Sequence, residues 1–354
     1  MNPYDFDGHK LHLHPQRVTE YLREGDCYPI YLEISPVGSC NQRCVFCAYD
    51  NIGYPNRKLE TARTLRLLDE LAECGLKSIL FAGEGEPLLH PDILRFVRHA
   101  QANGIDVGMF TNGQRLTPAV AAELLPYLTF LRFSFNAGTA ESYAAVHRVK
   151  GQIFQSVVDN ITSAVHLKRS MDLQLDIGAQ FVLIPENGQV LLPAVEVLRD
   201  CGIDYLAIKP FVQQENQSYR LSQQLTLEFI GPLLDEAERF RTSTFAVIAR
   251  RQSFEHYGER AYGHCLGTSF ITVVNSAGVV SSCLPHWDDE EFAFGSIYEQ
   301  SFKELWNSPK RRGVKFRVEE SLDVRSCPPN CRPHAVNTYL AQLGSAQVKH
   351  RNFI

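Results

Sequence analysis

The chain lacks the features that mark a membrane, secreted or duplex-binding protein. It has 354 residues, and no apolar run approaches the roughly 18 residues that a transmembrane helix requires. The stretch from Met1 to Pro15 is polar and rich in histidine, without the apolar segment of a signal peptide. A net charge of -5, from 35 basic and 40 acidic residues, lacks a basic excess. We therefore expect a cytoplasmic protein with no membrane span and no nucleic-acid partner.

Cysteine, by contrast, is abundant, with ten residues in the chain. In a reducing compartment cysteines are more often metal ligands or redox groups than disulfides. Seven of them fall into two groups: Cys40, Cys44 and Cys47, then Cys265, Cys283, Cys327 and Cys331. Cys27, Cys74 and Cys201 are scattered, and we expect the last two to be packed thiols, because each precedes a glycine at the end of a helical pattern.

Short β-rich runs alternate with longer amphipathic runs from about residue 30 to 240. The strands are expected at 30–35, 78–82, 106–110, 130–135, 174–183 and 205–209. The helices are expected at 59–74, 92–102, 118–125, 152–167, 188–201 and 226–241. Six βα repeats predict a parallel sheet, either a partial barrel or a doubly wound sheet. In both architectures ligands bind at the carboxyl ends of the strands.

The rhythm changes beyond about residue 245. Residues 270–274 and 279–282 predict a β-hairpin around the turn Asn275-Ser276-Ala277-Gly278. Residues 301–307 predict a short helix that stops at Pro309. We therefore expect three parts: an N-terminal extension over residues 1–29, the βα domain over 30–244 and a cysteine-containing module over 245–354.

The first cysteine group has the spacing C-x3-C-x2-C and directly follows the first expected strand. Three thiolates can hold three irons of a [4Fe–4S] cubane and leave the fourth iron open. Zinc is the alternative, but a structural zinc site uses four protein ligands, and this run offers three without an adjacent histidine.

This spacing, on the loop after the first strand of six βα repeats, resembles the signature of radical S-adenosylmethionine (radical SAM) enzymes. The resemblance implies a partial (βα)6 barrel in which the open iron chelates the amino and carboxylate groups of SAM. Reductive cleavage of SAM then gives methionine and a 5′-deoxyadenosyl radical. The resemblance also implies that Phe46, just before the third cysteine, packs against the adenine.

Further segments resemble the same family. Gly83-Glu84-Gly85-Glu86-Pro87 resembles its GGEP motif, with Glu84 in place of a glycine. A glycine such as Gly85 allows close approach of the backbone, and a carboxylate such as that of Glu86 suits the methionine ammonium. The resemblance thus assigns Glu84, Gly85 and Glu86 to the SAM site. Thr111-Asn112-Gly113 closes the third strand, as is common in the family.

The fourth strand reads Arg132-Phe133-Ser134-Phe135-Asn136 and resembles the S-x-D/N ending of the family. The resemblance implies that Ser134 and Asn136 reach the ribose and the carboxylate of SAM. Arg148, shortly before Gly151, matches an arginine often found near that carboxylate, although it could equally be a solvated charge on a helix.

The second group has the spacing C-x12-G-x4-C across the hairpin, followed by C-x3-C. It resembles the SPASM and twitch modules of radical SAM enzymes, which carry auxiliary iron–sulfur clusters. The resemblance also covers 294–297, where a Gly-Ser-Ile turn precedes a short helix with tryptophan. Val318 and Ser321 stand where a full SPASM module has further cysteines, so four thiolates remain for one auxiliary [4Fe–4S] cluster. Four thiolates are equally a zinc ligand set, and that alternative stays open.

The resemblance implies a reaction. A fully ligated auxiliary cluster can take an electron from a substrate radical, which turns hydrogen abstraction into oxidation. We expect oxidation of an alcohol carbon in a sugar, aminocyclitol or nucleotide-sugar-like molecule, as in carbohydrate or antibiotic biosynthesis. Epimerisation or dehydration of the same substrate, and modification of a peptide, are the alternative reactions. A protein that binds an iron–sulfur cluster or zinc without catalysis is the alternative to an enzyme.

The sequence also suggests a base and a partner. His286 is the first candidate for the base that deprotonates the hydroxyl, because it lies three residues after Cys283. Asp288, His334 and Glu215 are further candidates, and each could instead be a surface residue. The family implies a flavodoxin or ferredoxin as reductant. The 39 residues before Cys40 are expected to leave no room for a cobalamin or leader-peptide domain.

Overall fold

One sheet organises the molecule, in the part that the structure describes. The computed structural model describes residues 4, 8–214, 217–223 and 225–344. Ten strands are hydrogen-bonded in the order β10-β9-β8-β1-β2-β3-β4-β5-β6-β7. The strands are β1 (Tyr31–Ile34), β2 (Ser78–Phe81), β3 (Asp106–Thr111), β4 (Phe130–Ser134), β5 (Asp176–Leu183), β6 (Tyr205–Pro210), β7 (Ala246–Ala249), β8 (Ile271–Val274), β9 (Val279–Ser281) and β10 (Ala293–Ser296).

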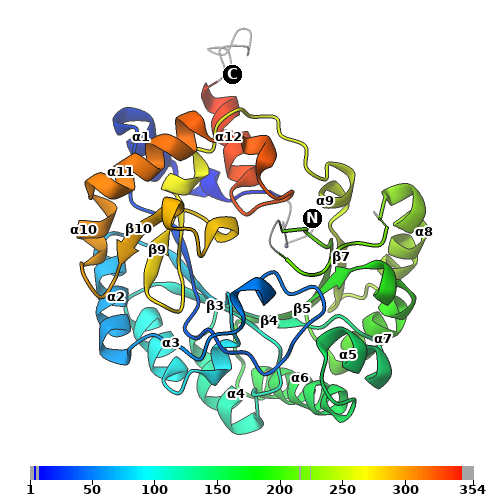
Figure 1. The fold of residues 1–354 in the computed structure, drawn as a ribbon. Coiled ribbons are helices and arrows are strands. Elements are labelled where there is room, and N and C mark those ends of the chain that lie inside the picture. The colour runs from blue at the N-terminus through cyan, green and yellow to red at the C-terminus, as the bar shows by residue number, and fades with distance from the viewer. Residues whose placement is uncertain (1–3, 5–7, 215–216, 224, 345–354) are drawn as a thin grey trace.

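The sheet is a partial barrel. Strands β1 to β7 pair in parallel and in chain order, whereas a doubly wound sheet reverses its order at a switch point. Helices α2 to α8 form an arc outside the strands (Figure 1). The predicted α/β fold is thus confirmed in its barrel form. The helices are α1 (Pro15–Glu24), α2 (Thr61–Glu73), α3 (Ile93–Ala102), α4 (Pro118–Leu124), α5 (Ala140–His147), α6 (Gln152–Ser170), α7 (Leu191–Cys201), α8 (Leu227–Glu238), α9 (Arg251–Glu255), α10 (Phe302–Trp306), α11 (Pro309–Phe316) and α12 (His334–Gly344).

Helix α2 shows why these segments fold as they do. Leu68 and Leu71 are fully buried, because apolar residues at helical spacing put one stripe against the sheet. Gly75 follows with a φ of +76°, a conformation that glycine adopts without strain, so the chain can turn into β2. Cys74 and Cys201 are both buried, as expected for packed thiols.

The six predicted strands and six predicted helices are all present, with ends shifted by a few residues. The sequence analysis missed the strands β7 and β10 and the helices α1, α5, α9, α11 and α12. Strand β7 lies just beyond the last recognised repeat and pairs in parallel with β6, so the barrel extends one strand further than predicted.

The predicted hairpin is present and continues the barrel sheet. Strand β8 pairs in parallel with β1, with Leu32 opposite Thr272, and β9 then pairs with β8 in antiparallel fashion. Residues on both sides of position 245 therefore share one sheet, and the three predicted domain ranges stay predictions. Pro309 stops α10 as expected, but it also begins α11, where a missing N–H has no cost.

Helices of the described residues also bear on the membrane expectation. None of them is both long and apolar enough to cross a bilayer.

Candidate functional site

The first cysteine group lies on the loop that follows β1. Cys40, Cys44 and Cys47 are half-buried free thiols, and the backbone folds back on itself as Cys47 N–H donates to Cys44 O at 3.1 Å. The buried amide of Gln217 donates to Phe46 O at 2.7 Å and to Cys47 O at 3.0 Å. The segment after β6 therefore fixes the loop from the far side of the barrel. Sequence reasoning missed Gln217, because nothing in its neighbourhood carries a motif.

A buried histidine supports the same loop. His147 Nδ1 lies 2.9 Å from Gln42 Oε1 and 3.3 Å from Cys44 Sγ. Burial lowers the pKa of His147 to about 3, so the ring is neutral. With its proton on Nδ1, His147 donates toward the amide oxygen and the sulfur, which favours a thiolate at Cys44. Both Gln42 and His147 are additions to the predicted site.

All seven cysteines of the two groups have a raised pKa, and burial is the main cause in each case. The pKa of Cys40 rises to about 11. A reactive cysteine shows the opposite, a depressed pKa in an electropositive site. These thiols therefore lack the depressed pKa that marks a nucleophilic cysteine.

The loop after β2 packs directly on the backbone before Cys40. A Cβ on Gly85 would come within 2.2 Å of Val37 O and 2.4 Å of Ser39 O. Only glycine allows this approach, which explains the residue at this position. Glu86 N–H then donates to Ser39 O at 3.0 Å, so the two loops form one unit.

Glu86 is buried, and its carboxylate joins β2 to β3. It accepts hydrogen bonds from Thr111 Oγ1 at 2.7 Å, Asn112 N at 2.8 Å and Leu88 N at 3.2 Å. Burial raises the pKa of Glu86, while these three donors oppose the shift. Asn112 Nδ2 in turn donates to Asn41 Oδ1 at 2.7 Å, beside Cys40. The predicted Thr111-Asn112-Gly113 segment thus positions the cysteine loop.

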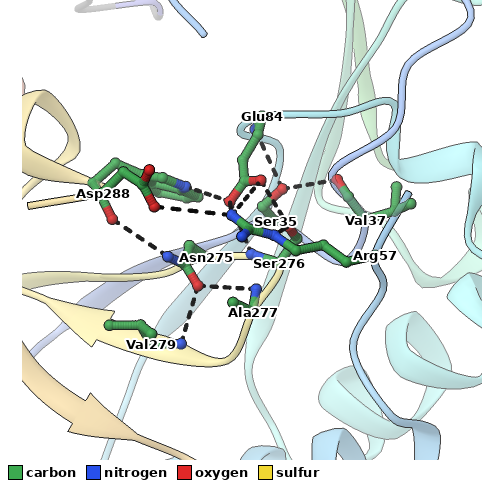
Figure 2. A network of polar contacts seen from close by, with 10 residues as sticks. Ser35, Val37, Arg57, Glu84, Asn275, Ser276, Ala277, Val279 and Asp288 are labelled. Carbon is green, nitrogen blue, oxygen red and sulfur yellow. Dashed lines mark hydrogen bonds and ion pairs between the residues drawn. The ribbon is translucent and has the colours of Figure 1, made fainter. Parts of the chain in front are cut away.

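Glu84 lies in a different network, shown in Figure 2. Its buried carboxylate accepts from Ser276 N at 2.9 Å, Ser276 Oγ at 2.6 Å and Trp287 Nε1 at 2.6 Å. Arg57 forms an ion pair with it at 3.2 Å. Ser276 belongs to the hairpin turn of the second cysteine region, so Glu84 links that region to the loop after β2. The predicted contact with SAM stays a prediction, and the structure supplies four protein donors to this side chain.

Of the other residues predicted to contact SAM, one lines the barrel cavity and the rest do not. Ser134 is half-buried and faces the barrel cavity. Asn136 is buried, and its Oδ1 accepts from Val182 N at 2.7 Å. Arg148 ends α5 in a left-handed conformation, and its charge acts on Cys44. Phe46 packs 6.4 Å from the ring of Phe211.

The second group brings together thiols from three segments. Cys265 precedes β8, Cys283 follows β9, and Cys327 and Cys331 precede α12. The charges of Cys327 and Cys331 each act on Cys265, and those of Cys265 and Cys331 act on Cys283. The structure therefore places the four predicted ligands near one another.

An amide lies against this second group. Asn337 Nδ2, on α12, is 3.2 Å from Cys265 Sγ, and Asn337 Oδ1 accepts from Gly267 N at 2.7 Å. Asn337 is buried and its orientation is fixed from both ends, so it is a further residue that the sequence analysis missed. An asparagine within a short helix has no motif that would have indicated this role.

A cavity of about 1920 Å³ connects the two groups. Its lining includes Cys40, Cys44, Cys327 and Cys331, together with Ser134. Gly85 and Glu86 line it as well, whereas Phe46, Glu84, Asn136 and Arg148 do not. Ligand pockets for small molecules typically measure about 300–1,000 Å³. The cavity is therefore larger than a typical site for one small molecule.

The proposed bases lie around this cavity, except that Glu215 is outside the described residues. His286 stacks on Phe292 at 3.6 Å between ring centroids, and its Nδ1 lies 3.4 Å from Asp289. His334 Nδ1 is 3.1 Å from Tyr262 OH, and burial lowers its pKa. Asp288 is largely exposed, with Arg57 at 4.0 Å. His286, Asp288 and His334 all line the cavity, and a role as base stays a prediction for each.

The donor sets fit iron–sulfur clusters. Among the described residues, no three His, Cys, Asp or Glu side chains converge as ligands of a single metal ion do. A cubane instead binds each thiolate at its own iron, so its ligands stand further apart. Three free thiols in one loop and four around one site match one open and one fully ligated cluster.

Fold and site together define an iron–sulfur protein built on a partial α/β barrel. The radical SAM superfamily profile matches residues 34–173, and that of the SPASM iron–sulfur cluster-binding domain matches residues 265–332. A GTP 3′,8-cyclase of Limosilactobacillus fermentum is 30% identical over 290 residues, 76% of this chain and 83% of that protein. The chain belongs to the radical SAM superfamily. Its cofactors are SAM and a [4Fe–4S] cluster, together with auxiliary iron–sulfur clusters in the SPASM domain.

Two further comparisons agree with this fold. A tungsten-containing aldehyde ferredoxin oxidoreductase cofactor-modifying protein of Pyrococcus furiosus is 24% identical, over 83% of this chain and 84% of that protein. The crystal structure of Streptococcus suis SuiB bound to S-adenosylmethionine matches with a TM-score of 0.64 at 16% identity. That match covers 86% of this chain and 72% of SuiB.

Proposed function

We propose that this radical SAM enzyme abstracts a hydrogen atom from a small polar substrate held in the barrel and completes a two-electron oxidation through its auxiliary cluster. The observation that supports this reaction is that one cavity is lined by Cys40 and Cys44 of the first group and by Cys327 and Cys331 of the second. A substrate in that cavity lies between the site where a radical is made and a site that can receive an electron.

The chain's own residues have distinct tasks in this reaction. Cys40, Cys44 and Cys47 would hold a [4Fe–4S] cluster, which would supply the electron that splits SAM into methionine and the 5′-deoxyadenosyl radical. Gln42, His147 and Gln217 hold the cysteine loop, while Gly85 and Glu86 hold the loop opposite. The substrate carbon would lose a hydrogen atom to the radical and its hydroxyl a proton to a base, and a cluster held by Cys265, Cys283, Cys327 and Cys331 would accept the remaining electron. We propose His286 as that base because it lines the cavity three residues after Cys283.

The substrate class that we favour is a sugar, aminocyclitol or nucleotide-sugar-like molecule, with an alcohol as the reacting group. Epimerisation or dehydration of the same molecule would need the same binding residues. A flavodoxin or ferredoxin is the proposed electron source. The GTP 3′,8-cyclase named above acts, by its name, on a nucleotide, which keeps nucleotide-like substrates in the screen.

Modification of a peptide is the second candidate. The cavity is larger than one small molecule needs, and SuiB, which shares the fold, has also been crystallised with its precursor peptide SuiA. A peptide substrate would enter through the same opening.

The test is a substrate screen with the anaerobically reconstituted protein. Each candidate sugar, aminocyclitol, nucleotide or peptide is incubated with SAM and dithionite, and 5′-deoxyadenosine and product mass are measured. Loss of two hydrogens from a small alcohol supports the proposal. An unchanged mass indicates epimerisation, loss of water indicates dehydration, and turnover of peptides alone favours the second candidate. Absence of 5′-deoxyadenosine with every addition would contradict a radical reaction altogether.

A further inference from the structure

Two positively charged side chains on neighbouring parts of the barrel sheet line the cavity between the two cysteine groups. Arg132 lies on β4 and Lys209 on β6, and both line the cavity. In the sheet register Arg132 is opposite Gly178, and Lys209 is opposite Val182 on the same strand, β5. The two cations therefore face the cavity from strands on either side of β5.

Lys209 is half-buried, and its side-chain ammonium forms no hydrogen bond or ion pair with any residue that the structure describes. Burial together with the charges of Arg250, Arg332 and Arg132 lowers its pKa to about 7, and Glu33 alone opposes this shift. Three arginines and one carboxylate, that of Glu33, therefore act on the charge of Lys209.

The carboxylate of Glu33 already has two partners. Glu33 is 3% exposed on β1 and pairs with Arg332 at 2.8 Å. It also accepts a hydrogen bond from Tyr31 OH at 3.1 Å. Glu33 therefore balances Arg332 and leaves the charge of Lys209 without a direct counterion among the described residues.

Arg132 is held in place by aromatic rings. Its Nε donates to Tyr205 OH at 3.0 Å, and its guanidinium carbon lies 4.9 Å from the centre of the Phe110 ring. Gly178 makes room for this arrangement, because a Cβ there would come within 2.2 Å of the Tyr205 ring. A guanidinium fixed in this way is prepared for the planar, two-point recognition of a carboxylate or a phosphate.

We propose that the barrel interior binds an anionic group of the substrate, a carboxylate or a phosphate, through Lys209 and Arg132. This inference rests on the proposed function, since it names the chemistry by which that substrate is held. Ser134 lies two residues after Arg132 and also lines the cavity, so a substrate anchored at the arginine extends toward the predicted SAM site. A buried cation without a direct counterion attracts an anion far more strongly than an exposed cation does.

The test measures anion binding by calorimetry with the anaerobically reconstituted protein. The probes are inorganic phosphate, tripolyphosphate and citrate, at low and at moderate salt. We expect Lys209→Gln to weaken the preferred probe at least tenfold, or about 1.4 kcal/mol. Lys209→Arg, which keeps the charge, should retain most of the affinity. Because Lys209 has no described partner, its removal leaves no buried group unpaired, and the variant should fold.

Lys77 supplies the matched control. It is an exposed lysine that lines the same cavity, so Lys77→Gln removes the same charge from a different place. We expect less than a twofold change. Preference for tripolyphosphate assigns a phosphate, and preference for citrate assigns a carboxylate. An equal loss in both glutamine variants, or no binding of any probe, would overturn the proposal.

Binding of the probes and cleavage of SAM are separate readouts. If the wild type cleaves SAM but binds no anion, the anion site is wrong and the proposed function stands. If it binds anions but makes no 5′-deoxyadenosine, the anion site stands and the radical function fails.

Discussion

The two cysteine groups are built in opposite ways. The first uses three thiols on one short loop, which is held by the loops after β2, β3 and β6 and by His147 at the end of α5. The second uses four thiols from three segments, which meet only because β8 pairs with β1 and thereby places the hairpin beside the barrel. Three thiolates leave one iron of a [4Fe–4S] cluster open for a ligand, whereas the four thiolates of the second group suffice to ligate every iron.

Removing the thiols of each group should separate the two roles most sharply. Cys40→Ala/Cys44→Ala/Cys47→Ala and Cys283→Ala/Cys327→Ala should each lower the iron content from about eight to about four per chain. Only the first variant should lose 5′-deoxyadenosine formation completely, because only the first group binds SAM. Iron, sulfide and nucleoside analysis under anaerobic conditions measures both. Loss of SAM cleavage in both variants would mean that the groups do not act independently.

The first group is local in the sequence and the second is not, and this difference decides how much of each could be predicted. The spacing of Cys40, Cys44 and Cys47 is local, so the first group could be predicted along with the strand before it. The side chains that hold it, such as Gln217 and His147, come from distant segments and belong to no motif. Their contacts depend on tertiary packing, which a linear pattern does not encode.

The second group was predicted only as a ligand set. The sequence indicated the hairpin correctly, but strand pairing between β8 and β1 joins residues far apart in the chain, and no local rule sets it. Glu84 shows the same limit, because its place in a family motif suggested a ligand of SAM. The structure surrounds its carboxylate with Ser276, Trp287 and Arg57, contacts that the motif does not indicate, while the contact with SAM stays a prediction.

The second prediction tests how closely the first group depends on its neighbouring loop. Gly85→Ala places a methyl group against two backbone oxygens, at 2.2 and 2.4 Å, so the loops must move apart. A displacement of about 1 Å can cost about 100-fold in rate, and we expect a loss of that order in 5′-deoxyadenosine formation.

Gly313→Ala is the control for this change, because nothing lies within 4 Å of the added Cβ and the residue is in the middle of α11. It should leave the rate unchanged and stabilise the helix by about 0.5–1 kcal/mol. Equal rates in Gly85→Ala and the wild type would show that the contact between the loops is not needed.

The third prediction concerns the hydrogen bonds of Glu84, which link the loop after β2 to the hairpin turn of the second cysteine region. Glu84→Gln removes a buried charge and forces an amide N–H₂ toward donors that now point at the carboxylate. We expect the free energy of unfolding to fall by about 2–3 kcal/mol, since Arg57 is partly exposed and can regain water while Ser276 and Trp287 cannot.

Glu123→Gln serves as the matched control for chemical denaturation. Its pair with Arg98 spans 3.0 Å between two exposed side chains, so the change should be below about 0.5 kcal/mol. If both variants lose the same free energy of unfolding, the ion pair of Glu84 contributes no more than an exposed ion pair does. Other contacts would then link the two regions.

The smallest effect is expected inside the second group, where the fold stays intact and only one electrostatic contact changes. Asn337→Asp keeps the oxygen that accepts from Gly267 N but replaces the donor that faces Cys265 Sγ with a negative oxygen. Hydrogen bonds to cluster sulfurs and nearby charge set the reduction potential, so the auxiliary potential should fall, on the order of tens of millivolts. Redox titration followed by electron paramagnetic resonance measures this potential separately from that of the first cluster.

A lower potential makes the auxiliary cluster a weaker electron acceptor, so product formation should slow while cleavage of SAM in the absence of substrate keeps its rate. A shift of the first cluster instead would show that Asn337 acts across the cavity, and the division of labour between the two groups would have to be abandoned.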